Sequence, residues 1–208
     1  MFTKERLDAL YWAVKESMSE KRFRHTAAVA DMAVRLSELF APDKKEILRA
    51  AGLLHDITKE YSTEKQLQIL KDFGIMVTDA DILTPKTLHA RTAALLIGRL
   101  YPEFSDPEII SAVRYHTTGR AGMTVTEKIV YFADYIDDTR TFPDCVMLRE
   151  SFWGADPARM NEKDRQEHFR KLLVLSFDKT IEALMAEGKL ISEDTLAARN
   201  HLILEAKG

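Results

Sequence analysis

Cysteine is nearly absent from this sequence, in which Cys145 is the only one among 208 residues. A single cysteine cannot form an intramolecular disulfide, and it cannot build the thiolate-rich sites that hold structural zinc. A chain without disulfides suits a reducing compartment, so we expect a cytoplasmic protein. No basic pattern surrounds Cys145, which is therefore interpreted as a small apolar residue and not as a nucleophile.

Long apolar runs and an excess of positive charge are missing as well. No segment approaches the ~18 consecutive apolar residues of a transmembrane helix. The N-terminal segment MFTKERLDALYWAVKE is charged and amphipathic, unlike a signal peptide. A net charge of −3 gives no general attraction to nucleic acid or to anionic membranes, so we expect neither as a partner.

Strand-like alternation is scarce, and the chain is predicted to be all-helical. The segment IMVTDADIL (75–83) is interpreted as a loop, and residues 138–160 as irregular because they contain two prolines and a glycine. No repeat or low-complexity linker interrupts the pattern, so we predict one domain over residues 1–208. Apolar side chains at helical spacing predict helices at about 4–17, 20–40, 43–54, 62–74, 85–100, 106–116, 124–136, 161–187 and 193–206.

The predicted helices have recognisable first residues. Asp43 and Glu46 have the spacing of a capping box, and so do Thr124 and Glu127. Pro85 suits the first turn of its helix, where a missing backbone N–H costs nothing.

Histidines fall on the apolar faces of four successive predicted helices. A single inward histidine is usually a core residue with a hydrogen-bond partner. Four of them need more polar partners than these faces supply. The inward histidines are His25, His55, His89 and His116, whereas His168 and His201 lie in charged C-terminal helices.

Two aspartates supply the missing partners. Asp56 directly follows His55, and adjacent helical side chains diverge by about 100°. The two side chains can therefore point towards one position at a helix end or towards two neighbouring metals. Asp134 lies in IVYFADYI, where an unpaired carboxylate costs several kcal/mol. Metal coordination removes that cost, and an ion pair with Arg or Lys from another helix is the alternative.

Nitrogen and carboxylate donors without thiolate suit iron, manganese or zinc. The number of donors exceeds the needs of one tetrahedral ion and suits two metals that share Asp56. The predicted ligand set is His25, His55, Asp56, His89, His116 and Asp134.

Other polar groups lie near these donors in the sequence. Lys59 is one helical turn beyond the His-Asp pair, and it is either a phosphate clamp, if the helix continues, or a solvated lysine. Thr117 and Thr118 end a helix, where hydroxyls and free amides bind phosphate, although Gly119 is explained by helix termination alone. Arg140 is either a phosphate ligand or part of a surface salt bridge.

The order of these residues resembles that of the HD-domain metal-dependent phosphohydrolases. The segments RHTAAVADMAVRLS, AGLLHDITK, LHARTAALL and AVRYHTTGRAGMTVTEKIVYFADYIDDTR resemble the YqeK family of bacterial HD proteins, over about residues 5–200. That family cleaves diadenosine tetraphosphate symmetrically into two ADP molecules. The resemblance implies a helical HD bundle around a metal site, with its core at about 20–140 and C-terminal helices at about 161–206 packed on it.

The resemblance also implies a ferrous or mixed-valence di-iron centre, with manganese or zinc as alternatives. By motif position, one iron is expected on His25, His55, Asp56 and Asp134, and the second metal or its phosphates on Asp56, His89 and His116. The expected catalytic residues are Asp56, Lys59 and His89. The expected substrate contacts are Lys59, His89, His116, Thr117, Thr118 and Arg140.

The sequence departs from the usual family motif after the last ligand. Asp137 stands where Glu is common, and Asp138 where Pro is common. Neither is an expected ligand, but Asp137 is a candidate carboxylate partner for a ligating histidine.

Two alternatives to cleavage of diadenosine tetraphosphate stay open. One is an HD phosphohydrolase that acts on other nucleotides (nucleoside monophosphates, deoxynucleotides or cyclic nucleotides), and the other is a nucleotide-sensing module without turnover. The expected partner is thus a dinucleoside polyphosphate or another nucleotide. Apolar residues of 170–185 serve either the core or the interface of a homodimer; they are Leu172, Leu173, Leu175 and Phe177.

Overall fold

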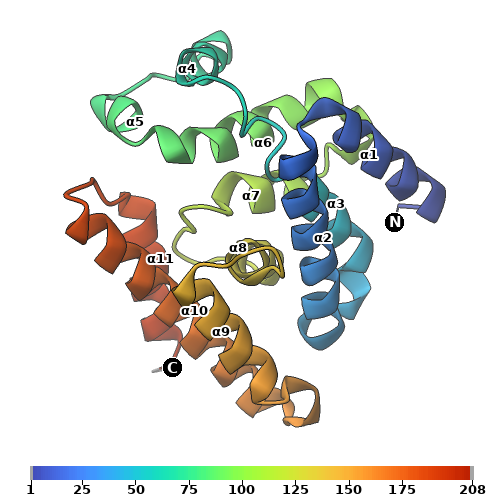
Figure 1. Cartoon of the computed structure of the whole chain (residues 1–208), viewed down its shortest axis with the longest axis vertical. Coiled ribbons are helices and arrows are strands. Elements are labelled where there is room, and N and C mark those ends of the chain that lie inside the picture. The colour runs from blue at the N-terminus through green and yellow to red at the C-terminus, as the bar shows by residue number, and fades with distance from the viewer. Residues whose placement is uncertain (1, 207–208) are drawn as a thin grey trace.

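The computed structural model describes residues 2–206, and helices are the only regular elements within them (Figure 1). The all-helical prediction is therefore confirmed. The helices are α1 (Lys4–Ser17), α2 (Glu20–Phe40), α3 (Lys45–Leu54), α4 (Thr63–Asp72), α5 (Asp79–Leu83), α6 (Leu88–Leu100), α7 (Pro107–Tyr115), α8 (Val125–Ile136), α9 (Pro143–Gly154), α10 (Glu162–Ala186) and α11 (Glu193–Glu205). Short 3₁₀ turns occupy Pro42–Lys44, Pro85–Thr87, Pro102–Phe104 and Pro157–Arg159.

The helix starts follow from local chemistry at most positions. Thr124 and Glu127 form the predicted capping box of α8, each side chain accepting the backbone N–H of the other. The capping box predicted for Asp43 and Glu46 is wrong, because Pro42 begins a 3₁₀ turn that delays the start of α3 to Lys45. Pro85 likewise starts a 3₁₀ turn before α6 and not the helix itself.

Two segments that were predicted to be irregular each contain a helix. Within 75–83, the Thr78 hydroxyl and the Asp81 carboxylate form a capping box that starts α5. Within 138–160, Pro143 begins α9, because proline fits a first helical turn as readily as it breaks a helix interior. The prediction read both prolines of this stretch as breakers.

The helices that hold the polar core approach one another closely. A Cβ on Gly52 of α3 would lie 2.6 Å from the Cα of Ala30 on α2, so only glycine permits this crossing. The imidazole rings of His25 and His55, carried by these two elements, consequently lie edge to face with centroids 5.4 Å apart.

Helices α10 and α11 pack on each other, and α10 packs against α8 and against Phe40 at the end of α2 (Figure 1). Phe177 of α10 stacks on Tyr131 of α8 with ring centroids 4.3 Å apart. Leu172, Leu173 and Phe177 are buried in the core, and Leu175 packs against it. These residues therefore belong to the core within the chain. A homodimer stays a prediction, and so does the single domain over residues 1–208.

No helix in the described part of the chain is long and apolar enough to cross a membrane.

Candidate metal centre

The four inward histidines are buried and meet at one place. His25 lies on α2, His55 follows the last residue of α3, His89 is in the first turn of α6, and His116 follows α7. The rings contact one another edge to face, with centroids 4.9 Å apart for His55 and His116 and 5.0 Å apart for His89 and His116.

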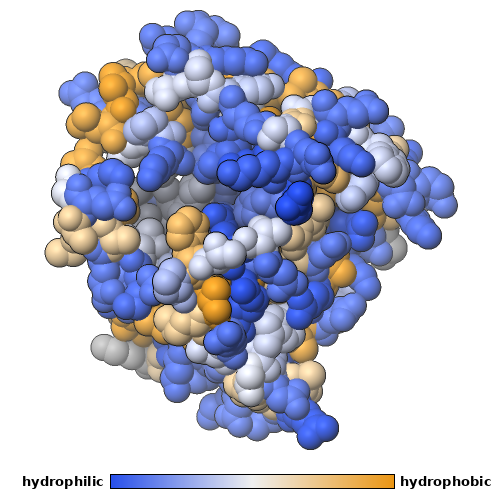
Figure 2. All heavy atoms as spheres, in the orientation of Figure 1, coloured by the Kyte–Doolittle hydropathy of each residue, from blue (hydrophilic) through white to orange (hydrophobic). Residues whose placement is uncertain are grey.

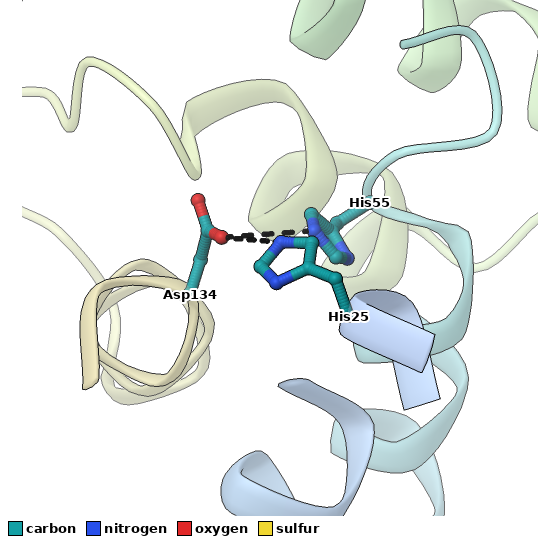
Figure 3. Close-up of side chains that lie close together, drawn as sticks. All are labelled: His25, His55 and Asp134. Atoms are coloured by element: carbon teal, nitrogen blue, oxygen red, sulfur yellow. Dashed lines mark ion pairs between the residues drawn. The ribbon is translucent and has the colours of Figure 1, made fainter. Parts of the chain in front are cut away.

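One group of donors consists of His25, His55 and Asp134, which come from three different elements (Figure 3). The Asp134 Oδ1 atom lies 3.0 Å from His25 Nε2 and 3.9 Å from His55 Nε2. All three donor atoms lie within 4.8 Å of one another, which is a separation that one bound ion can span. The Asp134 side chain keeps 18% exposure, so this group faces the mouth of the centre.

Asp56 lies between the histidines, and its two carboxylate oxygens face different groups of nitrogens. Its Oδ2 atom lies 3.8 Å from His25 Nε2 and 3.5 Å from His55 Nε2. Its Oδ1 atom lies 3.2 Å from His89 Nε2 and 3.8 Å from His116 Nε2. A carboxylate in this position can bridge two ions, each with its own imidazoles.

Backbone contacts set the orientation of two rings. The Nδ1 of His55 donates to the carbonyl of Gly52 and the Nδ1 of His116 to that of Val113, each at 2.7 Å. With Nδ1 protonated, each Nε2 presents its lone pair to the centre, which is the form that binds a metal.

His25 has a carboxylate behind it instead of a carbonyl. Its Nδ1 lies 3.3 Å from Asp137 Oδ2 and 3.4 Å from the Thr139 hydroxyl. The Asp137 side chain is fully buried, and its other oxygen accepts from the backbone N–H of Thr139 at 2.8 Å. Asp137 is thus placed to orient His25, as a carboxylate partner of a ligating histidine does.

Burial keeps most of these imidazoles neutral. It lowers the pKa of His55, lowers that of His89 well below the usual range, and lowers that of His116 to about 4. Burial opposes the charged form of Asp56 too, but His55, His89 and Lys59 lower its pKa below the usual range. Neutral imidazoles beside an ionised carboxylate are the protonation states of metal ligands.

His25 shows how strongly the carboxylates attract positive charge. Burial opposes protonation of His25, yet Asp134 and Asp137 raise its pKa to about 9. A divalent cation satisfies the same demand with more charge.

The centre also contains buried polar atoms that lack hydrogen-bond partners, namely His25 Nε2, His55 Nε2 and Asp56 Oδ1. Buried polar atoms that converge on one point without hydrogen bonds are costly unless a cation joins them. The nitrogen and oxygen donors present therefore fit divalent metal, and they are compatible with iron, manganese or zinc.

Two arginines occupy the outer edge of the centre. Arg22 Nη1 donates to Asp56 Oδ2 at 2.7 Å, and Arg140 pairs with Asp134 and lies 3.4 Å from Asp137 Oδ2. Asp134 therefore has the arginine partner considered above, although it comes from the loop after its own helix. The sequence analysis did not predict Arg22 as a site residue. Its position three residues before His25, on the same helix face, is the pattern that could have indicated it.

Lys59 reaches the centre by a different route from the predicted one. Helix α3 ends at Leu54, and turns such as Lys59 N–H to Asp56 C=O (2.9 Å) follow, so the helix does not continue. The Lys59 Nζ atom nevertheless lies 3.1 Å from His89 Nε2, and burial lowers its pKa. The buried Thr58 hydroxyl, which lies 2.8 Å from the His89 carbonyl, joins this turn to α6.

The threonines after His116 lie at the other edge of the centre. Thr118 is buried, and the Oγ1 atom of Thr117 is buried without a hydrogen-bond partner. Gly119 has φ +63°, and a Cβ there would lie 2.7 Å from Phe177 Cζ and 2.8 Å from Ala198 Cβ. The turn is therefore held against α10 and α11 by a close approach that only glycine allows.

Known proteins are similar to this chain over most of its length. The family model described as HD domain matches residues 22–139. A Bacillus subtilis protein named bis(5'-nucleosyl)-tetraphosphatase, symmetrical, is 33% identical over 190 residues, which cover 91% of this chain and 94% of that protein. A Staphylococcus aureus protein of the same name is 36% identical over 138 residues, which cover 65% of this chain and 69% of that protein.

A solved structure from Clostridium acetobutylicum has the same fold. It is described as a predicted HD superfamily hydrolase involved in NAD metabolism, and it is 33% identical. The TM-score is 0.82, and the match covers 99% of both chains.

Proposed function

Because the chain belongs to the YqeK family of HD-domain phosphohydrolases, we propose that it hydrolyses diadenosine tetraphosphate symmetrically into two ADP molecules. Water would add to one of the two inner phosphorus atoms, and the bridging P–O bond would break. The second ADP leaves with that oxygen, so one water is consumed for two products. The absence of disulfide chemistry supports a cytoplasmic setting for this reaction.

One observation carries the proposal, namely the position of Asp56 between two groups of imidazoles. We assign His25, His55 and Asp134 to one ion, and His89 and His116 to a second, with Asp56 shared. When bound, two such ions supply Lewis acidity and a water of lowered pKa. We propose iron as the native metal, with manganese or zinc as alternatives.

The other residues of the site would act on the phosphates. The Lys59 ammonium, beside His89, is placed to neutralise a non-bridging oxygen as charge develops on it. Arg22 and Arg140 are both about one-third exposed, so each can turn from its aspartate to a phosphate at the mouth. The unpartnered Thr117 hydroxyl can donate to another phosphate oxygen.

Another nucleotide is the second candidate substrate, which the Clostridium acetobutylicum relative favours because its description refers to NAD metabolism. A sensing module without turnover is the third. The test is to purify the protein anaerobically, measure its bound metal, and assay dinucleoside polyphosphates and nucleotides with identification of products. ADP as the sole product from diadenosine tetraphosphate is expected. AMP plus ATP, activity confined to monophosphates, or binding without turnover would contradict the proposal.

Replacing the shared carboxylate tests the two-metal assignment. Asp56→Ala is expected to lose bound metal and to lower turnover by at least ~10³-fold, because it removes a ligand common to both ions. Asp31→Ala on the exposed face of α2 is the matched control and should retain both. An active Asp56→Ala protein without metal would refute the assignment.

A further inference from the structure

A tight turn at residues 137–140 follows α8 and supports the metal centre from behind. Its first residue, Asp137, has one carboxylate oxygen 3.3 Å from the Nδ1 atom of His25. The other oxygen accepts the backbone N–H of Thr139 at 2.8 Å, and the Asp137 carbonyl accepts that of Arg140 at 3.1 Å. The direction of the Asp137 carboxylate is therefore tied to the backbone conformation of this turn.

A guanidinium from another helix holds the backbone of the 137–140 turn. Arg149 lies on α9, which packs against α8 (Figure 1). Its Nη1 atom donates to the carbonyl of Asp137 at 2.6 Å, to that of Arg140 at 3.2 Å and to that of Ile136 at 3.4 Å. One nitrogen thus joins the first and last residues of the turn to the end of α8.

There is a physical reason for a cation at this position. The last carbonyls of a helix have no partner within the helix, and the helix dipole places partial negative charge there. The carboxylates of Asp134, Asp137 and Asp138 add charge of the same sign. The Arg149 side chain keeps only 20% exposure, so solvent screens its contacts less than those of a surface pair. Arg149 therefore offsets negative charge that would otherwise open the turn.

We propose that Arg149 is a positioning residue, which acts on the metal centre through Asp137. Arg149 holds the 137–140 turn, the turn directs the Asp137 carboxylate at His25 Nδ1, and His25 then presents its Nε2 atom to the ion. This inference rests on the metal assignment of the proposed function. It adds a residue on α9, a helix that carries none of the assigned ligands.

The first test removes the guanidinium. Arg149→Met keeps a long side chain that suits a helix but has no N–H donor. In chelator competition, affinity for Mn²⁺ should fall about 10-fold, the lower end for groups that orient ligating histidines, because Arg149 acts one contact farther away. Arg149→Lys should retain most of the wild-type affinity, because all three contacts come from one nitrogen and an ammonium also has three donors.

Arg35→Met is the matched control. Arg35 approaches the same turn from α2, but its contact there is the carboxylate of Asp138 at 3.3 Å, and both side chains are exposed. Its loss should leave affinity for Mn²⁺ unchanged. Wild-type affinity in Arg149→Met would overturn the inference even if urea unfolding showed lower stability, because Arg149 would then support only the fold.

A double-mutant cycle tests the route through Asp137. In the Asp137→Asn background, Arg149→Met should change affinity for Mn²⁺ by less than about 2-fold, because the carboxylate through which it acts is already neutral. A full loss in both backgrounds would refute this route. If Arg149→Met does not fold, Arg149→Gln, which keeps an N–H donor without the charge, takes its place in both backgrounds.

The proposed reaction can fail separately, because metal binding is measured without substrate. A wild type that binds Mn²⁺ without cleaving diadenosine tetraphosphate, together with weaker binding in Arg149→Met, would refute the reaction and retain the role of Arg149. Cleavage by the wild type, together with unchanged binding in Arg149→Met, would retain the reaction and refute that role.

Discussion

The metal centre and the neighbouring pocket are lined by different kinds of side chain. Four histidines and two aspartates from α2, the turn after α3, α6, the end of α7 and α8 make the centre, and hydrogen bonds to backbone carbonyls orient two of the rings. The pocket is a hollow of about 380 Å³ between residues 83–87, Thr117, Thr118 and the C-terminal helices (Figure 2). The described lining of the pocket contains no histidine and no carboxylate, only leucines, hydroxyl side chains, one proline and two lysines. The centre therefore depends on charge and protonation, and the pocket depends on shape and on the position of the C-terminal helices.

The difference indicates how each region should respond to substitution. A change in the centre should alter metal affinity at nearly constant fold stability, because its polar groups serve the ion. A change at the joint between the two regions should alter stability first, because packing holds the pocket in place. The first two predictions below test this contrast, and the third concerns the scaffold outside both regions. They are given in order of decreasing expected change in free energy.

The largest effect is expected at Gly119, the joint between the regions. Gly119→Ala combines a left-handed backbone, at roughly 1–2 kcal/mol, with overpacking against Phe177 and Ala198, at roughly 1–3 kcal/mol. We expect about 2–5 kcal/mol less stability and a fall in the unfolding midpoint of about 2–4 °C per kcal/mol. Urea and thermal unfolding measure it.

Gly122→Ala is the matched control for Gly119→Ala. Gly122 has φ +64°, but its added Cβ would meet nothing closer than His201 Nε2 at 3.8 Å. Only the backbone cost of about 1–2 kcal/mol is then expected. Equal losses in the two variants would show that the turn is not held by close packing.

A smaller effect is expected behind the centre, at Asp137. Asp137→Asn keeps the shape of the side chain but removes the charge that faces His25 Nδ1. We expect metal affinity to fall about 10- to 100-fold, as for other carboxylate partners of ligating histidines. Competition with a chelator measures the affinity, and Asp138→Asn, whose side chain is 68% exposed, is the control. If Asp137→Asn binds metal with wild-type affinity, Asp137 does not orient His25 for metal binding.

The smallest effect is expected at Glu108 of α7, outside both regions, whose carboxylate accepts hydrogen bonds from Lys44 and from Thr126 of α8. Burial raises the pKa of Glu108, but hydrogen bonds from Lys44 and Thr126 outweigh burial and leave the pKa below its usual value. The unfolded chain then binds protons more readily, so this stabilisation is present above the unfolded pKa and is lost as pH falls through the folded pKa.

Glu108→Gln should therefore cost less than ~1 kcal/mol at neutral pH, and the cost should shrink towards about pH 3. Urea unfolding of both proteins across this range measures it, with the exposed Glu103→Gln as control. A cost that grows on acidification would contradict the assigned sign.

Local patterns predicted most of the helices. They failed where a residue type can occupy two kinds of position, as proline can either end a helix or begin one. The capping box of Thr124 and Glu127 was found because both partners lie within one turn. Pro143 was read as a breaker although it starts α9, and only packing of that helix against its neighbours shows which use applies. The box of Thr78 and Asp81 lies in the segment that comes nearest to strand-like alternation, and that segment was interpreted as a loop.

The ligand set was predicted from helix faces, and its geometry was not. Periodicity places each imidazole on a buried face, but it does not say which oxygen of Asp56 faces which rings. The pairing of Arg22 with Asp56 depends on how α2 meets the turn after α3, and Gly52 makes that approach possible. Lys59 reached the centre although the helix predicted to carry it ends at Leu54.

The sequence by itself determined the all-helical class, the donor types and their burial, because helix periodicity and residue chemistry act over a few positions. The tertiary structure alone decided that the two oxygens of Asp56 face different pairs of imidazoles, that arginines cover two of the aspartates, and that the C-terminal helices form a pocket beside the turn after His116. These features require contacts between segments far apart in the chain. Their positions follow from the crossing of packed helices, which no local pattern specifies.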